Sequence, residues 1–254
     1  MAGKTAIITG AANGIGKAIA KRFAEAGSNL ILIDKDKEGL TALSDSFKEN
    51  GVKVDCFSFD LSRKESIDEF WDKIEGSKVN ILVNNAGVYP FKKFLSLDYS
   101  YLEKIMQINL YSILWMCQNM IKKRGKKGGT IVNFGSIEAI MPFKDDLTQY
   151  SLSKIGVIAL TRDLAREFGR KGFRVNAILP GGILSNGTKA AAKDAIAKFN
   201  VKLISDGYNF FQRIPAGRLG DPDEIARMVL VLSSEMSSYM YGAIIPVDGG
   251  FLSA

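Results

Sequence analysis

The chain has 254 residues, of which 46% are hydrophobic, so we expect a single globular domain over residues 1–254 with a large buried core. No stretch approaches the roughly 20 apolar residues of a membrane helix, and the amino-terminus runs directly into a strand pattern, which predicts a cytoplasmic protein without a signal peptide. The net charge is +7, and the densest basic run, 122–127, follows a helix pattern without interleaved aromatic residues. We interpret that run as a surface loop, so neither nucleic acid nor a membrane is an expected partner.

Short β-branched runs alternate with longer helical patterns along most of the chain. Strands are predicted at residues 5–9, 29–33, 53–57, 79–83, 130–134, 174–178 and 243–247. Helices are predicted to begin near Gly14, Lys37, Arg63, Asp98, Thr148 and Pro222. Strands that alternate with helices favour parallel pairing with both faces covered. We therefore predict an α/β fold, a Rossmann-type doubly wound parallel sheet of about seven strands with helices on both faces.

One segment, residues 184–214, interrupts this alternation. A small-residue helix pattern at 190–198 leads to Tyr208, Phe210 and Phe211 without a strand signal. A long excursion of this kind is typical of a lid or substrate loop. Packing inside the domain, or contact with another subunit, explains the three aromatic residues equally well.

A glycine-rich turn follows the first predicted strand. Gly10 permits the tight turn, Gly14 lets the backbone approach a diphosphate, and Gly16 lets the following helix lie close to the sheet. Asp34 ends the second predicted strand, where a carboxylate accepts hydrogen bonds from ribose hydroxyls. A 2′-phosphate about 4 Å from that carboxylate would be repelled by roughly 4 kcal/mol at an effective dielectric near 20. The pattern predicts NAD as the cofactor, unless a nearby lysine neutralises the phosphate of NADP.

The absence of histidine makes the pair Tyr150 and Lys154 informative, because general acid/base work near neutral pH usually falls to histidine. The two residues are four apart on a predicted helix, so their side chains share one face. Ser136 follows a predicted strand at the carboxyl edge of the sheet, where ligands of α/β folds bind. Acid/base chemistry by a tyrosine calls for a pKa lowered by up to about three units, roughly 4 kcal/mol, which an adjacent ammonium together with the positive nicotinamide of oxidised cofactor is expected to supply. Without histidine, and with two separated cysteines, we expect no metal site.

Several motifs stand in the order found in short-chain dehydrogenases/reductases, and the resemblance spans nearly the whole chain. The matching positions are residues 9–16 and 84–87, Asn109, Ser136, Tyr150 with Lys154, residues 180–181 and residues 247–250. The resemblance implies hydride exchange between a nicotinamide cofactor and an alcohol or ketone. It also implies a homotetramer, in which the helices beginning near Asp98 and Thr148 pack across a twofold axis.

The same resemblance implies individual roles. The catalytic residues would be Asn109, Ser136, Tyr150 and Lys154, with Asn109 anchoring a water that passes protons between Lys154 and solvent. The cofactor contacts would be Gly10, Asn13, Gly14, Ile15, Gly16, Asp34, Asp60, Leu61, Asn85, Ala86, Gly87, Tyr150, Lys154, Pro180, Gly181, Ile183 and Ser185. Among these, residues 60–61 would face the adenine, and Ser185 stands where many members have threonine.

The substrate is less sharply indicated. Ser136, Glu138, Phe143 and Tyr150 are the expected substrate contacts, in a largely apolar pocket where Glu138 is the one acidic group able to bind a polyol. We expect a secondary alcohol or ketone. A sugar or polyol dehydrogenase and a 3-oxoacyl-thioester reductase remain alternatives in the same family. Outside enzymes, the alternative is an NAD-binding sensor or interaction protein; a serine hydrolase is excluded because no histidine base and no Gly-x-Ser-x-Gly motif is present.

Overall fold

The computed structural model describes residues 1–184 and 201–254, and its centre is one seven-stranded parallel sheet. The strands are β1 (Thr5–Thr9), β2 (Asn29–Asp34), β3 (Val54–Ser58), β4 (Val79–Asn84), β5 (Gly129–Phe134), β6 (Phe173–Pro180) and β7 (Ile244–Val247). Their order across the sheet is β3-β2-β1-β4-β5-β6-β7. The order reverses between β1 and β4, which is the point where α/β sheets bind ligands at the carboxyl ends of their strands. The predicted fold class is confirmed.

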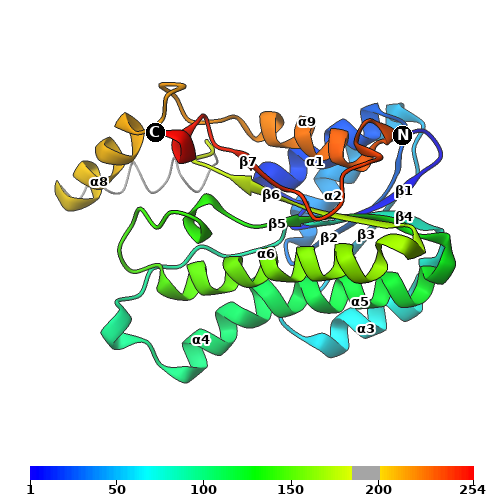
Figure 1. Ribbon diagram of the computed structural model, residues 1–254. Helices are drawn as coiled ribbons and strands as arrows, with labels where there is room; N and C mark the ends of the chain where they lie inside the picture. The colour runs from blue at the N-terminus through cyan, green and yellow to red at the C-terminus, as the bar shows by residue number, and fades with distance from the viewer. Residues whose placement is uncertain (185–200) are drawn as a thin grey trace.

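Helices cover both faces of the sheet (Figure 1). One layer holds α1 (Gly14–Glu25), α2 (Lys37–Asp45) and α9 (Pro222–Ser233). The other holds α3 (Lys64–Lys73), α4 (Tyr99–Met106), α5 (Ser112–Arg124) and α6 (Thr148–Phe168). Two cores result because successive strand side chains point to opposite faces: Ile8 packs in the first layer and Ile7 in the second. None of the helices in the described ranges is long and apolar enough to cross a membrane.

Local capping explains where several helices begin. Asp36 and Asp98 each accept a hydrogen bond from a first-turn amide of α2 and α4. Asp221 and Glu224 form a reciprocal capping box at the start of α9, with Pro222 in its first turn. These side chains satisfy amides that have no partner inside the helix, which is why acidic residues mark the helix starts.

Two features differ from the expectation. Tyr208, Phe210 and Phe211 lie on a helix, α8 (Val201–Gln212), rather than in a loop. Between α4 and α5 the chain forms a π-helical turn, η4 (Gln107–Tyr111), which contains Asn109. The helix expected at 190–198 lies outside the described residues.

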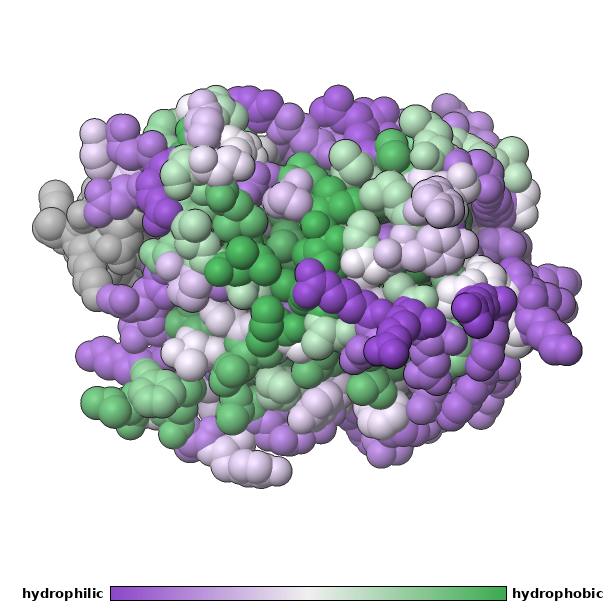
Figure 2. All heavy atoms as spheres, in the orientation of Figure 1, coloured by the Kyte–Doolittle hydropathy of each residue, from purple (hydrophilic) through white to green (hydrophobic). Residues whose placement is uncertain are grey.

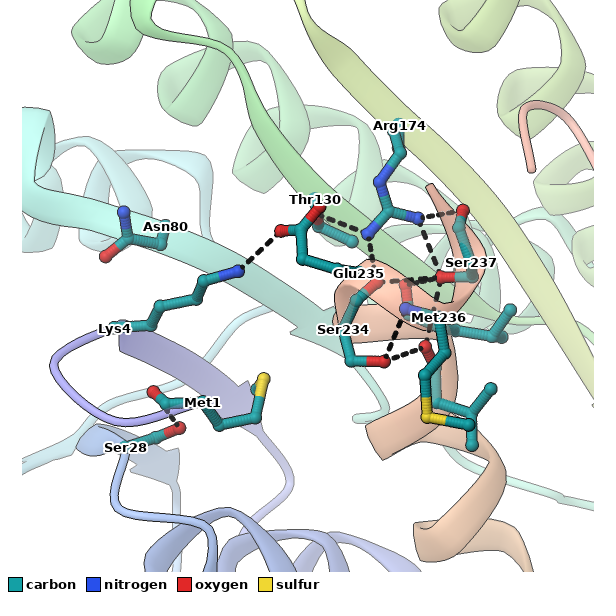
Figure 3. A network of polar contacts seen from close by, with 12 residues as sticks. Met1, Lys4, Ser28, Asn80, Thr130, Arg174, Ser234, Glu235, Met236 and Ser237 are labelled. Carbon is teal, nitrogen blue, oxygen red and sulfur yellow. Dashed lines mark hydrogen bonds and ion pairs between the residues drawn. The ribbon is translucent and has the colours of Figure 1, made fainter. Parts of the chain in front are cut away.

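A polar network closes the amino-terminal edge of the sheet (Figure 3). The Arg174 guanidinium, at the start of β6, donates to the backbone oxygen and hydroxyl of Ser237 at 2.8 Å each, and to the Thr130 hydroxyl and the Ser234 backbone oxygen at 3.1 Å each. Lys4 pairs with Glu235 at 3.0 Å. The network ties the turn η8 (Glu235–Ser237) to β5 and β6, so these basic residues have a structural role at the edge opposite the carboxyl ends of the strands.

Candidate active site

The glycine turn leads from β1 into α1 in the form a phosphate site requires. Gly10 and Gly14 have φ values of +65° and +54°, a backbone region that glycine tolerates best. A Cβ on Gly14 would meet nothing within 4 Å, whereas one on Gly16 would clash with the backbone oxygen of Gly10. Asn13 precedes α1 without capping it through its side chain, so the first-turn amides, from Ile15 onward, have no side-chain partner there. This open, positively polarised helix start fits the diphosphate of a dinucleotide.

Asp34 lies beside that turn. Its carboxylate accepts hydrogen bonds from the backbone amides of Ala12 at 3.0 Å and Asp36 at 3.1 Å. Asp36 in turn accepts from the Asn13 side chain at 3.2 Å. The glycine turn, the end of β2 and the start of α2 are thus joined, and the Asp34 carboxylate is held in one orientation next to the loop.

Thr9 and Asn85 join the end of β4 to the same turn. The Thr9 hydroxyl accepts hydrogen bonds from the Asn85 and Ala86 amides, each at 3.0 Å. The Asn85 side chain donates to the backbone oxygens of Thr9 at 2.9 Å and Gly10 at 3.1 Å. Sequence reasoning gave Thr9 no role of its own; its position directly before Gly10, at a strand end, is the signal that identifies it.

Lys154 lies on α6 with only 4% of its surface exposed, and its ammonium donates to the Phe134 backbone oxygen at 2.8 Å. A Cβ on Gly87 would lie 3.5 Å from the Lys154 nitrogen and 3.2 Å from the Asn109 amide oxygen. Burial lowers the pKa of Lys154 to about 8. The structure therefore brings the ends of β4 and β5 together with α6 at one ammonium group.

Tyr150 and Ser136 meet at the same edge. Their side chains are hydrogen-bonded, and the Lys154 nitrogen lies 5.8 Å from the centre of the Tyr150 ring. Burial raises the pKa of Tyr150 to about 12, the bond with Ser136 opposes this, and the charge of Glu138 adds to it. In the protein without cofactor the pKa of Tyr150 is raised, chiefly by burial, which is opposite to the lowering expected from Lys154 together with a bound oxidised nicotinamide.

Asn109 lies in the π-helical turn, and hydrogen bonds hold its side chain in place. Its amide oxygen accepts from the Val88 amide at 2.8 Å, and its amide nitrogen donates to the Val88 backbone oxygen at 2.9 Å and to the Ser153 hydroxyl at 3.3 Å. The Ser153 hydroxyl donates to the Tyr150 backbone oxygen at 2.7 Å. The Asn109 side chain therefore ties the segment after β4 to the amino-terminal part of α6. A water relay beside it stays a prediction. Single-turn π distortions of this kind are frequent at functional sites.

The remaining predicted cofactor residues lie around this edge. Pro180 ends β6, the Gly181 amide donates to the Val247 backbone oxygen at 3.0 Å, and Ile183 forms a bridge with Gly220. Asp60 is exposed and accepts from the Ser62 amide at 2.9 Å, whereas the Leu61 side chain is buried in the core. Ser185 lies outside the described residues.

The predicted substrate contacts divide into two groups. Glu138 is buried beside Ser136, whose hydroxyl accepts from the Glu138 amide at 3.2 Å. Phe143 instead packs its ring against Phe210 at 4.7 Å and Phe251 at 5.2 Å, which joins α8 and the carboxyl-terminal segment to the loop before α6. Its contact with substrate stays a prediction. Figure 2, in the orientation of Figure 1, shows hydrophobic residues gathered in the middle of the side of the molecule that faces the viewer.

The fold and the site define a dinucleotide-dependent oxidoreductase of the doubly wound α/β class. Residues 10–252 match the family described as enoyl-(acyl carrier protein) reductase. The chain is 34% identical over 256 residues to the 3-oxoacyl-(acyl-carrier-protein) reductase FabG of Aquifex aeolicus, covering 98% of this chain and 97% of that protein. It is also 34% identical over 255 residues to the 2-dehydro-3-deoxy-D-gluconate 5-dehydrogenase of Bacillus subtilis, covering 99% and 95%.

A solved structure, the L-sorbose reductase of Gluconobacter frateurii complexed with NADPH and L-sorbose, is similar with a TM-score of 0.92 at 27% identity, covering 100% of this chain and 98% of that one. The chain belongs to the short-chain dehydrogenase/reductase family, as its motifs predicted. It is accordingly an oxidoreductase that uses a nicotinamide cofactor, NAD or NADP, on an alcohol or ketone.

Proposed function

We propose that this protein is an NAD-preferring dehydrogenase/reductase of secondary alcohols and ketones, with Tyr150 as the general acid and base. The observation that supports this best is the meeting of three side chains at the carboxyl edge of the sheet. Tyr150 is hydrogen-bonded to Ser136, and the buried Lys154 ammonium lies beside them next to Gly87. A protein that only bound the dinucleotide would need no hydrogen-bonded Ser-Tyr pair at this place.

The chemistry divides between the cofactor and these side chains. A bound nicotinamide supplies the hydride acceptor or donor, and in its oxidised form a positive charge. Tyr150 donates its phenolic proton to the carbonyl oxygen in reduction, and as phenolate it takes the hydroxyl proton in oxidation. Ser136 hydrogen-bonds the same substrate oxygen and stabilises the charge that develops there. Lys154 stabilises the phenolate electrostatically and is the group placed to hold the nicotinamide ribose.

The proposed preference for NAD over NADP depends on the position of the Asp34 carboxylate. Its carboxylate is fixed beside the glycine turn by two backbone amides, so it cannot turn away from a 2′-phosphate without losing both bonds. Asp36 adds a second carboxylate at the start of α2. The L-sorbose reductase structure contains NADPH, so relatives of this fold accept the phosphate. Lys17, Lys35 and Lys37 are the exposed cations near enough in the chain to oppose the repulsion.

The decisive experiment replaces the phenol. Tyr150→Phe is expected to lower kcat/KM for alcohol oxidation by about a hundredfold or more, because acid/base groups contribute at least that much. NADH binding, followed by fluorescence, should stay within about threefold, since the hydroxyl adds little to cofactor affinity. Tyr239→Phe is the matched control because that ring is 98% exposed. Full activity in the Tyr150→Phe protein would refute the proposed role.

A homotetramer is proposed from the exposed apolar residues at α4 and α6. Phe94, Leu95 and Tyr99 are exposed near the start of α4, and Leu152 and Ile155 are exposed on α6. Apolar side chains gathered on one surface are typical of an interface between subunits. Light scattering after size exclusion is expected to give about four times the chain mass, and Leu152→Glu together with Ile155→Glu should reduce that mass; a monomeric wild type would contradict the proposal.

A further inference from the structure

One buried carboxyl group beside Ser136 and Tyr150 has an oxygen without a hydrogen-bond partner among the described residues. Glu138 lies in the turn η6 (Ile137–Ala139) directly after Ser136, and 1% of its surface is exposed. Its oxygen Oε2 accepts from the Phe143 amide at 3.4 Å. Its other oxygen, Oε1, has no hydrogen-bond partner among the described residues. Leaving a buried carboxylate oxygen unpaired costs free energy, so such an atom calls for a ligand that donates to it.

Glu138 lies beside the reacting groups: its backbone amide donates to the Ser136 hydroxyl at 3.2 Å, and the Ser136 and Tyr150 side chains are hydrogen-bonded. Its charge acts on Tyr150 and on Tyr89, and burial together with that charge raises the pKa of Tyr89. The Tyr89 ring meets the Tyr150 ring edge-on at 4.7 Å. The Glu138 side chain thus lies near Ser136 and Tyr150, the two residues proposed to hold the reacting substrate oxygen.

The other polar groups around Glu138 offset part of the cost of burying its carboxylate, but none of the described ones donates to Oε1. Burial raises the pKa of Glu138 to about 7, against hydrogen bonds from the amides of Phe143 and Lys144, a contact with the Ser151 hydroxyl and the positive charge of Lys144. The Lys144 ammonium lies over the Phe91 ring, 4.7 Å from its centre, instead of forming an ion pair with Glu138 in the described structure. The oxygen Oε1 of Glu138 is therefore left able to accept a hydrogen bond from a neutral group of a ligand.

We infer that Glu138 accepts a hydrogen bond from a second hydroxyl of the substrate, on the carbon next to the reacting one, so that the protein acts on vicinal diols and hydroxyketones. This inference rests on the proposed function, because Tyr150 and Ser136 define the position of the reacting oxygen. A hydroxyl is the fitting donor, since it is neutral and can replace the water that a buried acceptor would otherwise hold. A site with a buried acceptor also discriminates strongly against an analogue that lacks the donor.

The test compares two substrates that differ by one hydroxyl, cyclohexanol and trans-1,2-cyclohexanediol, with NAD. Wild type is expected to favour the diol in kcat/KM. In Glu138→Leu the diol-to-monool ratio should fall by about ten- to a hundredfold, as expected for loss of a hydrogen bond to a charged group. Glu138→Gln keeps the shape and one acceptor, so a smaller fall is expected, and it serves if the leucine protein does not fold. Ile140→Ala, in an exposed position after the same turn, is the control whose ratio should not change.

A second readout separates recognition from a structural role. Because the carboxylate is the better acceptor, the diol preference of wild type should grow as the pH rises from 6 to 8, through the pKa of about 7, and should be flat in Glu138→Gln. An unchanged ratio in both variants, or equal losses for both substrates, would overturn the inference and assign Glu138 to loop packing or to a bound water. Tyr150→Phe distinguishes failure of the proposed function from failure of the inference on Glu138. If Tyr150→Phe abolishes turnover of both alcohols while the Glu138 variants keep the wild-type diol-to-monool ratio, only the inference on Glu138 fails.

Discussion

Gly14 offers a clean test of the proposed cofactor cradle, because the chain contains a matched glycine elsewhere. Gly14 has φ +54° and Gly51, on the surface after a turn at Lys48–Asn50, has φ +67°. A Cβ at either position would meet nothing within 4 Å. Alanine therefore causes backbone strain at both sites but no collision, and the strain of a left-handed conformation is roughly 1–2 kcal/mol. Gly14→Ala and Gly51→Ala are expected to lower the free energy of urea unfolding by that same amount.

Gly14→Ala and Gly51→Ala should differ only in their affinity for the dinucleotide. If the empty space at Gly14 is where the diphosphate approaches the backbone, the added methyl group occupies it. The Kd for NADH, measured by fluorescence titration, should rise by about tenfold or more, equivalent to about 1.4 kcal/mol, in Gly14→Ala and stay at the wild-type value in Gly51→Ala. An unchanged NADH affinity in Gly14→Ala, or an equal loss of affinity in Gly14→Ala and Gly51→Ala, would show that Gly14 is needed only for the backbone conformation.

Three further predictions concern charge. Asp34→Ser should narrow the NAD-to-NADP ratio of kcat/KM by about tenfold or more, since it removes the carboxylate expected to repel the 2′-phosphate; an unchanged ratio would contradict this. Arg174→Met should lower the free energy of unfolding by about 3 kcal/mol because it strands buried acceptors, whereas the exposed Arg170→Met should change it by less than about 0.5 kcal/mol in the same urea titration. Burial lowers the pKa of Lys154 from 10.5 to about 8. The loss of folding stability from burying the charged side chain is therefore complete below pH 8 and absent above pH 10.5. Wild type should therefore gain up to about 3 kcal/mol relative to Lys154→Met as the pH rises through that window, and a constant difference would refute the buried ammonium.

The strands and most helix starts were predictable because their signals are local. Alternating or continuous β-branched runs, and acidic caps such as Asp98 and Asp221, act within a few residues of where they stand. Helix α8 was missed because Gly207 and three aromatic residues weaken the helical signal in its second half. The π-helical turn at Asn109 has no local signature, because it depends on the Asn109 amide reaching the backbone of Val88.

Sequence patterns indicated which side chains of the candidate site meet at one edge of the sheet, but not the electrostatics there. Glycine spacing and the Tyr-Lys interval fix which side chains share an edge, since both follow from strand and helix geometry. A pKa depends instead on how much water the fold removes, which no spacing records. Tyr150 shows the difference most clearly, because its burial reverses the expected direction of the shift.

That reversal bears on how the site works. With a pKa of about 12, the Tyr150 phenol stays protonated at neutral pH, which is the state that donates a proton to a carbonyl oxygen becoming an alkoxide. Forming the phenolate near pH 7 costs about 7 kcal/mol across about five pKa units, so oxidation demands further positive charge beside the ring. Lys154 lies 5.8 Å from the ring centre and has itself lost part of its preference for the charged state through burial. The Glu138 carboxylate raises the demand when it is ionised, and a substrate hydroxyl donating to it would disperse its charge. If Glu138 binds substrate as proposed, this one buried acid would couple substrate recognition to proton transfer.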